Sequence, residues 1–221
     1  MRSRKIASLR WCVPLAVAFL ALATTTLRAD QTSIKSDLTN TGAAVGSATD
    51  PRLASGDTSG LIFTPVVANS NGSFTAPPLG APSDAVTVDV PPGCLGYCGL
   101  SGFVETTFTL PSDFTAASLT GAANVDDGGY AFLNGNLISG QLSEFGNVAF
   151  TTNDLAYFLA GVNTFVISDS NSGGGPSGVA YFADIDYTIP SATPEPGSFL
   201  LLGSGLVGLA GMVRRKIANR A

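Results

Sequence analysis

The chain of 221 residues contains no histidine. Histidine is the common general base at neutral pH and a usual ligand of zinc in proteins. Its absence excludes Ser-His-Asp and Cys-His catalysis and the ordinary zinc sites. Any hydrolysis by this chain would have to rely on carboxylates alone.

Basic residues are nearly absent from the middle of the chain. Of the 11 Lys and Arg, nine lie before residue 30 or after residue 193, and the two that remain are Lys35 and Arg52. The same segment holds 15 of the 16 acidic residues, so its net charge is near −13. Because nucleic-acid binding needs Lys and Arg to neutralise phosphates, we expect no nucleic-acid partner.

Residues 1–29 have the organisation of a secretory signal peptide. Basic residues precede an apolar run over residues 11–23, and the run is short and interrupted by Pro14. Small residues offer two cleavage sites, one after Ala23 and a later one after Ala29. We therefore expect export through the Sec translocon, with a signal helix that is removed.

Cysteine and tryptophan are scarce. The single Trp11 and one of the three cysteines, Cys12, fall in the signal segment. In an oxidising compartment the remaining pair, Cys94 and Cys98, is expected to form a disulfide that closes a short loop. A metal site is not expected here because no histidine or further cysteine is present, and the spacing is one residue longer than a C-x-x-C redox motif.

Residues 30–190 have the pattern of an all-β domain. Apolar residues alternate over residues 103–110 and 179–189, and Asn134-Gly135 is a strong hairpin signal. Residues 126–129 predict a turn, and residues 153–160 a short helix or turn. Residues 30–60 are polar and leave two alternatives open, an edge strand with a loop or partial disorder. Many short strands with hardly any helical pattern predict an antiparallel β-sandwich, jelly-roll-like.

The last segment, residues 191–221, has three parts in a fixed order. Pro194, Glu195 and Pro196 come first, an apolar Gly-rich run over residues 197–213 follows, and a basic cluster closes it. The cluster consists of Arg214, Arg215 and Lys216. A helix of 17 residues would be roughly 26 Å long, slightly short for a membrane core of about 30 Å. The pattern predicts a marginal transmembrane helix with a cytoplasmic basic end.

These three parts resemble the PEP-CTERM sorting signal of exported Gram-negative bacterial proteins. The resemblance implies processing by an exosortase-type membrane enzyme, with transient anchoring before release to the cell surface or extracellular matrix. Proteins with this signal have varied roles, many of them linked to exopolysaccharide and biofilm.

A second resemblance concerns the body. Residues 126–136, 159–165 and 178–182 are similar to the hairpin and following strands of galactose-binding-domain-like jelly rolls. That fold includes carbohydrate-binding modules and also accessory domains that bind no sugar. The resemblance therefore implies a fold and leaves the activity open.

Three groups of residues are candidates for chemistry. Asp126 and Asp127 could hold Ca²⁺ together with turn carbonyls, or serve only as polar turn residues. Asp184 and Asp186 lie on one face of a predicted strand, as paired glycosidase carboxylates or as solvent-facing residues. Tyrosines could stack on sugar rings or pack in the sandwich. Those tyrosines are Tyr97, Tyr130, Tyr157 and Tyr181.

From the sequence we expect a non-enzymatic, sorted surface or matrix protein with no cofactor. The alternative is a carbohydrate-binding module that holds extracellular polysaccharide, with Ca²⁺ as its candidate cofactor. A hydrolase that uses carboxylates alone is the third hypothesis.

Overall fold

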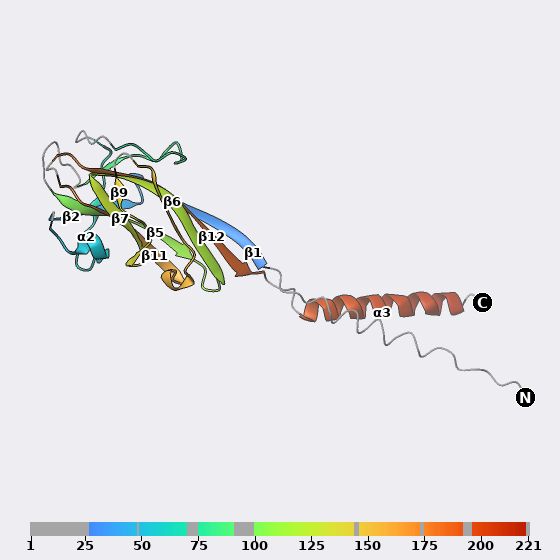
Figure 1. The fold of residues 1–221 in the computed structure, drawn as a ribbon. Coiled ribbons are helices and arrows are strands. Elements are labelled where there is room, and N and C mark those ends of the chain that lie inside the picture. The colour runs from blue at the N-terminus through green and yellow to red at the C-terminus, as the bar shows by residue number, and fades with distance from the viewer. Residues whose placement is uncertain are drawn as a thin grey trace, which may run out of the picture. The chain divides into compact units, whose positions relative to one another are not determined.

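The computed structural model describes residues 27–47, 49–69, 75–90, 100–143, 146–172, 175–191 and 196–219 (Figure 1). Residues Arg28–Ile189 form one compact unit, called the body here. The C-terminal helix α3 (Pro196–Ala218) belongs to a second unit and is described separately.

The body contains two β-sheets. Sheet A has the order β1 (Leu27–Lys35), β12 (Gly178–Pro190), β6 (Ala116–Asp126) and β10 (Val148–Thr152), and β4 (Val88–Asp89) also pairs with β12. Sheet B has the order β3 (Thr64–Pro65), β2 (Thr41–Gly46), β5 (Ser101–Leu110), β11 (Gly161–Asp169), β7 (Gly128–Leu133) and β8 (Asn136–Leu137). β9 (Leu142–Ser143) pairs with β7. The predicted antiparallel β-sandwich is confirmed.

The main core lies between the two sheets because one face of each long strand is apolar. The alternation predicted for residues 179–189 is confirmed, since Val179, Tyr181 and Ile185 of β12 are buried. Aromatic rings connect the layers: Phe165 of sheet B lies 5.6 Å from Phe150 and 5.2 Å from Tyr181 of sheet A, centroid to centroid. Such contacts between large rings contribute strongly to the packing of a sandwich.

Two predicted local features are confirmed. Asn134 and Gly135 have φ values of 50° and 79° and form the hairpin between β7 and β8. Residues Leu155–Tyr157 form the 3₁₀ helix η1, and Asp154 caps it by accepting a hydrogen bond from Ala156 N at 3.0 Å.

The turn predicted over residues 126–129 is wrong. β6 ends at Asp126 in sheet A and β7 begins at Gly128 in sheet B, so the chain passes between the sheets at Asp127. Gly129 lies against β11, where a Cβ atom would stand 1.7 Å from Ser168 O. Gly129 is therefore needed because β7 and β11 approach each other closely. In the sequence, the same glycine looks like a turn residue.

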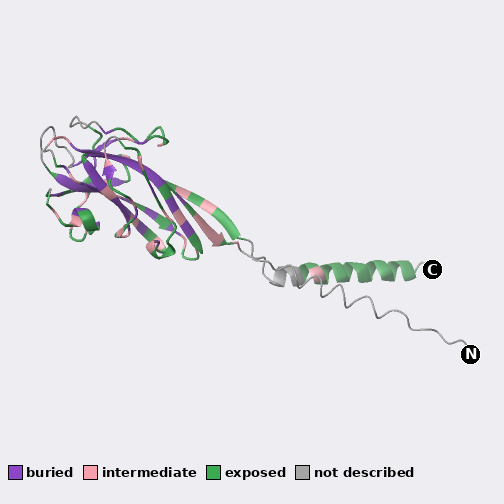
Figure 2. Cartoon of the chain, viewed as in Figure 1, coloured by how far each residue is buried: buried purple, intermediate pink, exposed green. Residues whose placement is uncertain are grey.

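The outward face of sheet B has a second apolar layer, called the outer cluster. Its buried members are Leu53, Phe103, Phe132 and Val166, and Leu61, Phe63 and Tyr130 pack against them. The covering segment, residues 49–63, includes the short helix α2 (Arg52–Ser55), which contacts β7 and β11. The strands of sheet B are thus buried on both faces over this region, as the continuous burial along them in Figure 2 illustrates.

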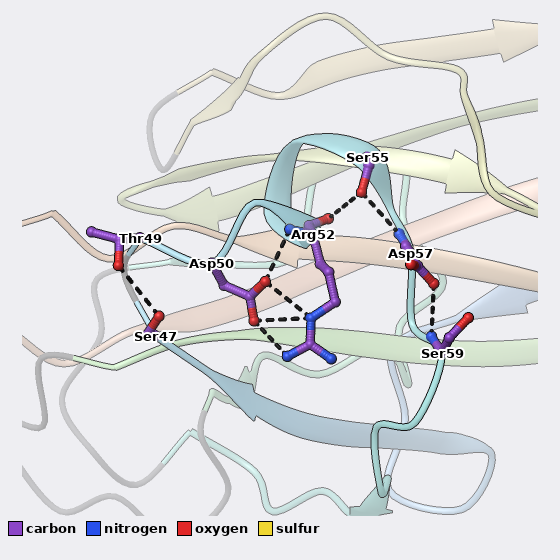
Figure 3. A network of polar contacts seen from close by, with 7 residues as sticks. All are labelled: Ser47, Thr49, Asp50, Arg52, Ser55, Asp57 and Ser59. Carbon is purple, nitrogen blue, oxygen red and sulfur yellow. Dashed lines mark hydrogen bonds and ion pairs between the residues drawn. The ribbon is translucent and has the colours of Figure 1, made fainter.

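A polar network holds the covering segment in shape (Figure 3). Asp50 accepts three hydrogen bonds from the Arg52 guanidinium, at 2.9 Å from Nε to Oδ1, 3.0 Å from Nε to Oδ2 and 2.6 Å from Nη2 to Oδ2. Asp57 accepts a hydrogen bond from Ser59 N at 2.9 Å. The hydrogen bond from Arg52 lowers the pKa of Asp50, so the pair stays charged at neutral pH.

The signal helix predicted within residues 1–29 falls largely outside the described residues, which begin with strand β1 at Leu27. In the C-terminal segment the predicted helix is present as α3 and is longer than expected. It continues through Arg214, Arg215 and Lys216. The predicted apolar span is corrected: within the part of the chain that the structure describes, no helix has both the length and the apolar character for crossing a membrane.

Candidate functional site

The basic cluster of the C-terminal segment lies at the end of α3. Arg214, Arg215 and Lys216 are exposed there, and positive charges at a helix C-terminus interact favourably with the helix dipole. Pro196 is the first residue of the helix, a position that proline favours. Pro194 and Glu195 lie outside the described residues. The structure thus places the basic end at the C-terminus of the predicted helix.

Side chains along α3 leave much apolar surface exposed. Leu201, Val207 and Met212 are among its exposed apolar residues (Figure 2). A Cβ atom at Gly203, or at the other described glycines of the helix, would meet nothing within 4 Å. Packing within the chain therefore does not explain these glycines, each of which costs a helix about 1 kcal/mol relative to alanine.

Asp126 and Asp127 lie where the chain passes between the sheets. Asp126 is buried, and Asp127 Oδ2 accepts hydrogen bonds from Ser172 N at 2.8 Å and Ser172 Oγ at 3.0 Å. Asp169, at the end of β11, is completely buried, and its Oδ2 atom lies 2.6 Å from Ser177 Oγ, within hydrogen-bonding distance. The name acid junction is used below for this group of five residues. They are Asp126, Asp127, Asp169, Ser172 and Ser177. Among the described residues, no group of three or more carboxylates or cysteines is placed to hold a metal ion.

Asp169 has an unusual electrostatic environment. Burial raises the pKa of its carboxyl group well above the ordinary value, and the charges of Asp126 and Asp127 raise it further. The hydrogen bond between Asp169 and Ser177 lowers the pKa, and burial outweighs this effect. Sequence analysis missed Asp169, although the alternation of Phe165, Ile167 and Asp169 along β11 places it on the inward face.

The candidate tyrosines have different surroundings. Tyr130 is half-buried against the outer cluster, so only part of its ring is accessible, and its sugar contact stays a prediction. Tyr181 is buried in the main core, and burial raises its pKa to about 12. Tyr97 lies outside the described residues, as do Cys94 and Cys98.

The edge of the sandwich contains a cavity of about 550 Å³, called the edge cavity. Its polar lining includes Lys35, Asp37, Asn40, Asp84 and Thr106. Lys35 forms an ion pair with Asp84, and this hydrogen bond lowers the pKa of the Asp84 carboxyl group. One of the two bases of residues 30–193 therefore lines this cavity.

Buried hydroxyl groups adjoin the edge cavity. Thr106 Oγ1 lies within hydrogen-bonding distance of Tyr181 OH and donates to Asn40 O at 3.3 Å. Thr41 Oγ1 lies 3.4 Å from the same Tyr181 OH. The cavity thus combines hydroxyl, amide and carboxylate groups with the apolar side chains of Ile34 and Val86. Sequence analysis did not find it because its lining comes from segments far apart in the chain.

Asp184 and Asp186 lie on the outward face of sheet A. Both are exposed, and Asp186 Oδ1 accepts a hydrogen bond from Gln31 Nε2 at 3.0 Å. Neighbouring residues on this face are hydroxyls, including Thr120 and Thr151, whose Oγ1 atoms lie 3.1 Å apart. A glycosidase acid and base need different surroundings, with one carboxyl group in an apolar pocket, whereas both of these carboxylates are exposed.

The chain combines a β-sandwich body with a C-terminal segment that matches a known sorting motif. Residues 192–216 match the family model described as the PEP-CTERM protein-sorting motif. The chain therefore carries this motif, which implies export and processing by an exosortase-type enzyme. The match covers the tail and gives no information on the body.

The body is weakly similar to parts of solved glycosidases. A β-glucuronidase of an uncultured Clostridium sp. is 11% identical, covers 74% of this chain and 29% of its own, and has a TM-score of 0.41. A β-glucuronidase of Ruminococcus gnavus is 16% identical, covers 70% of this chain and 29% of its own, and has a TM-score of 0.42. The chain thus spans less than a third of these proteins. At these TM-scores the likeness carries no argument for a shared activity. No curated protein matches the chain.

Proposed function

We propose that this protein is a non-catalytic surface or extracellular-matrix component that an exosortase-type enzyme processes at its C-terminal segment. The sorting motif at residues 192–216 is the observation that carries the proposal. The chain contains no histidine, and the paired carboxylates Asp184 and Asp186 are exposed to solvent, which supports a non-catalytic body.

The processing is tested by the intact mass of the protein recovered from a host that encodes an exosortase and from a strain without it. We expect a product shortened at its C-terminus only when the enzyme is present. Glu195→Ala should reduce processing, and Ser191→Ala, one residue outside the matched motif, should not. A mature product that still ends at Ala221 in both strains would show that the proposal is wrong.

The intact mass of the recovered protein also identifies where the signal peptide is cleaved. Cleavage after Ala29 would remove Leu27, Arg28 and Ala29 from strand β1, together with the ion pair between Arg28 and Asp30. Cleavage after Ala23 leaves the strand complete. We therefore expect the mature chain to begin at Thr24.

The absence of catalysis is tested with the purified full chain on polysaccharide and aryl-glycoside substrates. We expect no turnover above the background rate. Hydrolysis that Asp186→Asn or Asp184→Asn abolished would instead establish the carboxylate hydrolase.

The edge cavity favours a second candidate function, binding of extracellular polysaccharide. Its hydroxyl, amide and carboxylate groups suit the hydroxyls of a sugar, and Ile34 and Val86 supply apolar contacts. The strongly acidic body disfavours polyanionic ligands, so a neutral sugar chain is the class that fits.

A glycan array probed with the full chain, with and without EDTA, tests this candidate. We expect binding that Asn40→Ala weakens and that Thr151→Ala leaves unchanged, because Thr151 lies on β10, at the other edge of sheet A from β1. Binding lost in EDTA would restore the Ca²⁺ hypothesis for Asp126 and Asp127. If the chain binds no glycan, carbohydrate binding is ruled out as part of the proposed matrix role.

A further inference from the structure

The acid junction contains a buried carboxyl group with an unusual set of partners. Asp169 follows Phe165 and Ile167 on the inward face of β11 and is completely buried. Its neighbours in the strand register are Gly102 and Gly129, which have no side chains to pair with it. No described residue donates a hydrogen bond to its Oδ1 atom.

The number of hydrogens available to the contacts of Ser177 constrains the protonation state of the Asp169 carboxyl group. Ser177 Oγ lies 2.6 Å from Asp169 Oδ2 and within hydrogen-bonding distance of Asp126 O. Asp126 O, a main-chain carbonyl oxygen, can only accept, and a serine hydroxyl has a single hydrogen to donate. If Ser177 donates to Asp126 O, the contact with Asp169 is satisfied only when Asp169 Oδ2 carries the other hydrogen. An ionised Asp169 leaves one of the two close contacts without a hydrogen.

The surrounding charges also oppose ionisation. The described titratable groups around the junction are Asp126 and Asp127, with Asp89 of β4 opposite Gly178, next to Ser177. The described bases of the body are engaged elsewhere. They form the ion pairs Lys35–Asp84, Arg52–Asp50 and Arg28–Asp30. An anion at Asp169 would therefore be buried without a cation, an arrangement that proteins avoid.

We propose that Asp169 is a neutral carboxylic acid at neutral pH and donates the first hydrogen bond of a relay, Asp169 to Ser177 to Asp126, that closes this end of the sandwich. The relay joins the end of β11 in sheet B to the end of β6 and the start of β12 in sheet A. The raised pKa of Asp169 agrees with this geometry. Alkaline pH removes the relay's first hydrogen and loosens the junction.

The direction of the pH effect follows from linkage. The pKa of Asp169 in the folded protein lies above that of an unfolded aspartate, so its contribution is fully present below the unfolded pKa and is lost as pH rises through the folded pKa. Between these two values the unfolding equilibrium constant should rise roughly tenfold per pH unit on account of this group.

The test compares unfolding of the full chain, in mild detergent, with that of Asp169→Asn between pH 4 and pH 9. Asparagine keeps the shape and a hydrogen donor but cannot ionise, so the variant should gain stability relative to the wild type as pH rises. The exposed Asp184→Asn on β12 is the matched control and should show no such trend. A pH-independent difference between Asp169→Asn and the wild type would overturn the proposal.

A second measurement keeps the proposal testable if Asp169→Asn fails to fold. The carboxyl ¹³C resonance of Asp169, assigned in the wild type, should stay at the position of a protonated acid at pH 7. A resonance at the carboxylate position would refute the neutral acid. Stabilisation of the wild type by Ca²⁺ at pH 7 that Asp169→Asn lacked would also refute it, because the site would then bind a cation in place of the proton.

Discussion

The outward faces of the two sheets differ in what covers them. On sheet B the covering segment adds the outer cluster, so Phe103 and Phe132 are buried outside the main core. On sheet A, Thr120, Thr151 and Asp184 face solvent. The two faces explain two sequence patterns. Buried and exposed residues alternate from Ala183 to Asp186, where β12 is open to solvent, whereas adjacent apolar residues such as Phe132-Leu133 mark a strand that is covered on both sides.

The largest loss of stability is expected from Phe132→Ala, which tests whether the covering segment contributes to folding. Phe132 is 1% exposed and is a central member of the outer cluster. Removing a buried phenyl ring costs about 3–5 kcal/mol, as it does in a main core. Urea unfolding of the full chain measures it, with exposed Leu137→Ala on β8 as the control. A loss near that of the control would mean that the covering segment contributes little.

A smaller effect is expected from Gly56→Ala in the covering segment. Gly56 has a φ of 65°, and a Cβ atom there would lie 2.4 Å from Phe132 Cγ. We expect a loss of about 1–3 kcal/mol from the forced rearrangement and the backbone strain. Gly60 has a φ of 75° with nothing within 4 Å of its Cβ position. Gly60→Ala therefore measures the strain alone, and equal losses in the two variants would contradict the packing of α2 against β7.

The network of Figure 3 predicts a local effect. Arg52→Gln removes the three guanidinium hydrogen bonds to Asp50. We expect faster chymotrypsin cleavage near Leu53 and Leu61 with little change in global unfolding, because local opening is sufficient for proteolysis. Arg28→Gln, at the exposed pair with Asp30, serves as the control. Unchanged cleavage near Leu53 would show that apolar packing alone holds the segment.

The smallest effect is expected on the open face of sheet A. Thr151→Ala removes one contact between exposed hydroxyls, and substitutions at such positions usually change stability by less than about 0.5 kcal/mol. The same urea experiment measures it. A loss comparable to that of Gly56→Ala would indicate that this face is covered in the native protein.

Local features of the fold were predictable from sequence, and long-range ones were not. The period-two pattern around Val104 and Tyr181 and the Asn134-Gly135 dipeptide act within a few residues, so the sequence predicted them correctly. The Asp126–Gly129 segment was misassigned because Asp and Gly favour turns, whereas the crossing between sheets depends on β11. In the candidate site, the linear sorting motif was readable, but the relay through Asp169 and Ser177 depends on tertiary contacts.

The place of β12 in its sheet has a mechanical consequence. β12 lies between β1 and β6, with eleven residue pairs in register with β6 alone, and it is the last strand before the sorting segment. If the protein is held at its C-terminus, a pulling force enters the body through a strand bonded on both sides. Shearing that strand breaks two ladders of hydrogen bonds at once, whereas an edge strand would peel away from one. A pull on the C-terminal segment would therefore act first on a strand that has two hydrogen-bonded neighbours in sheet A.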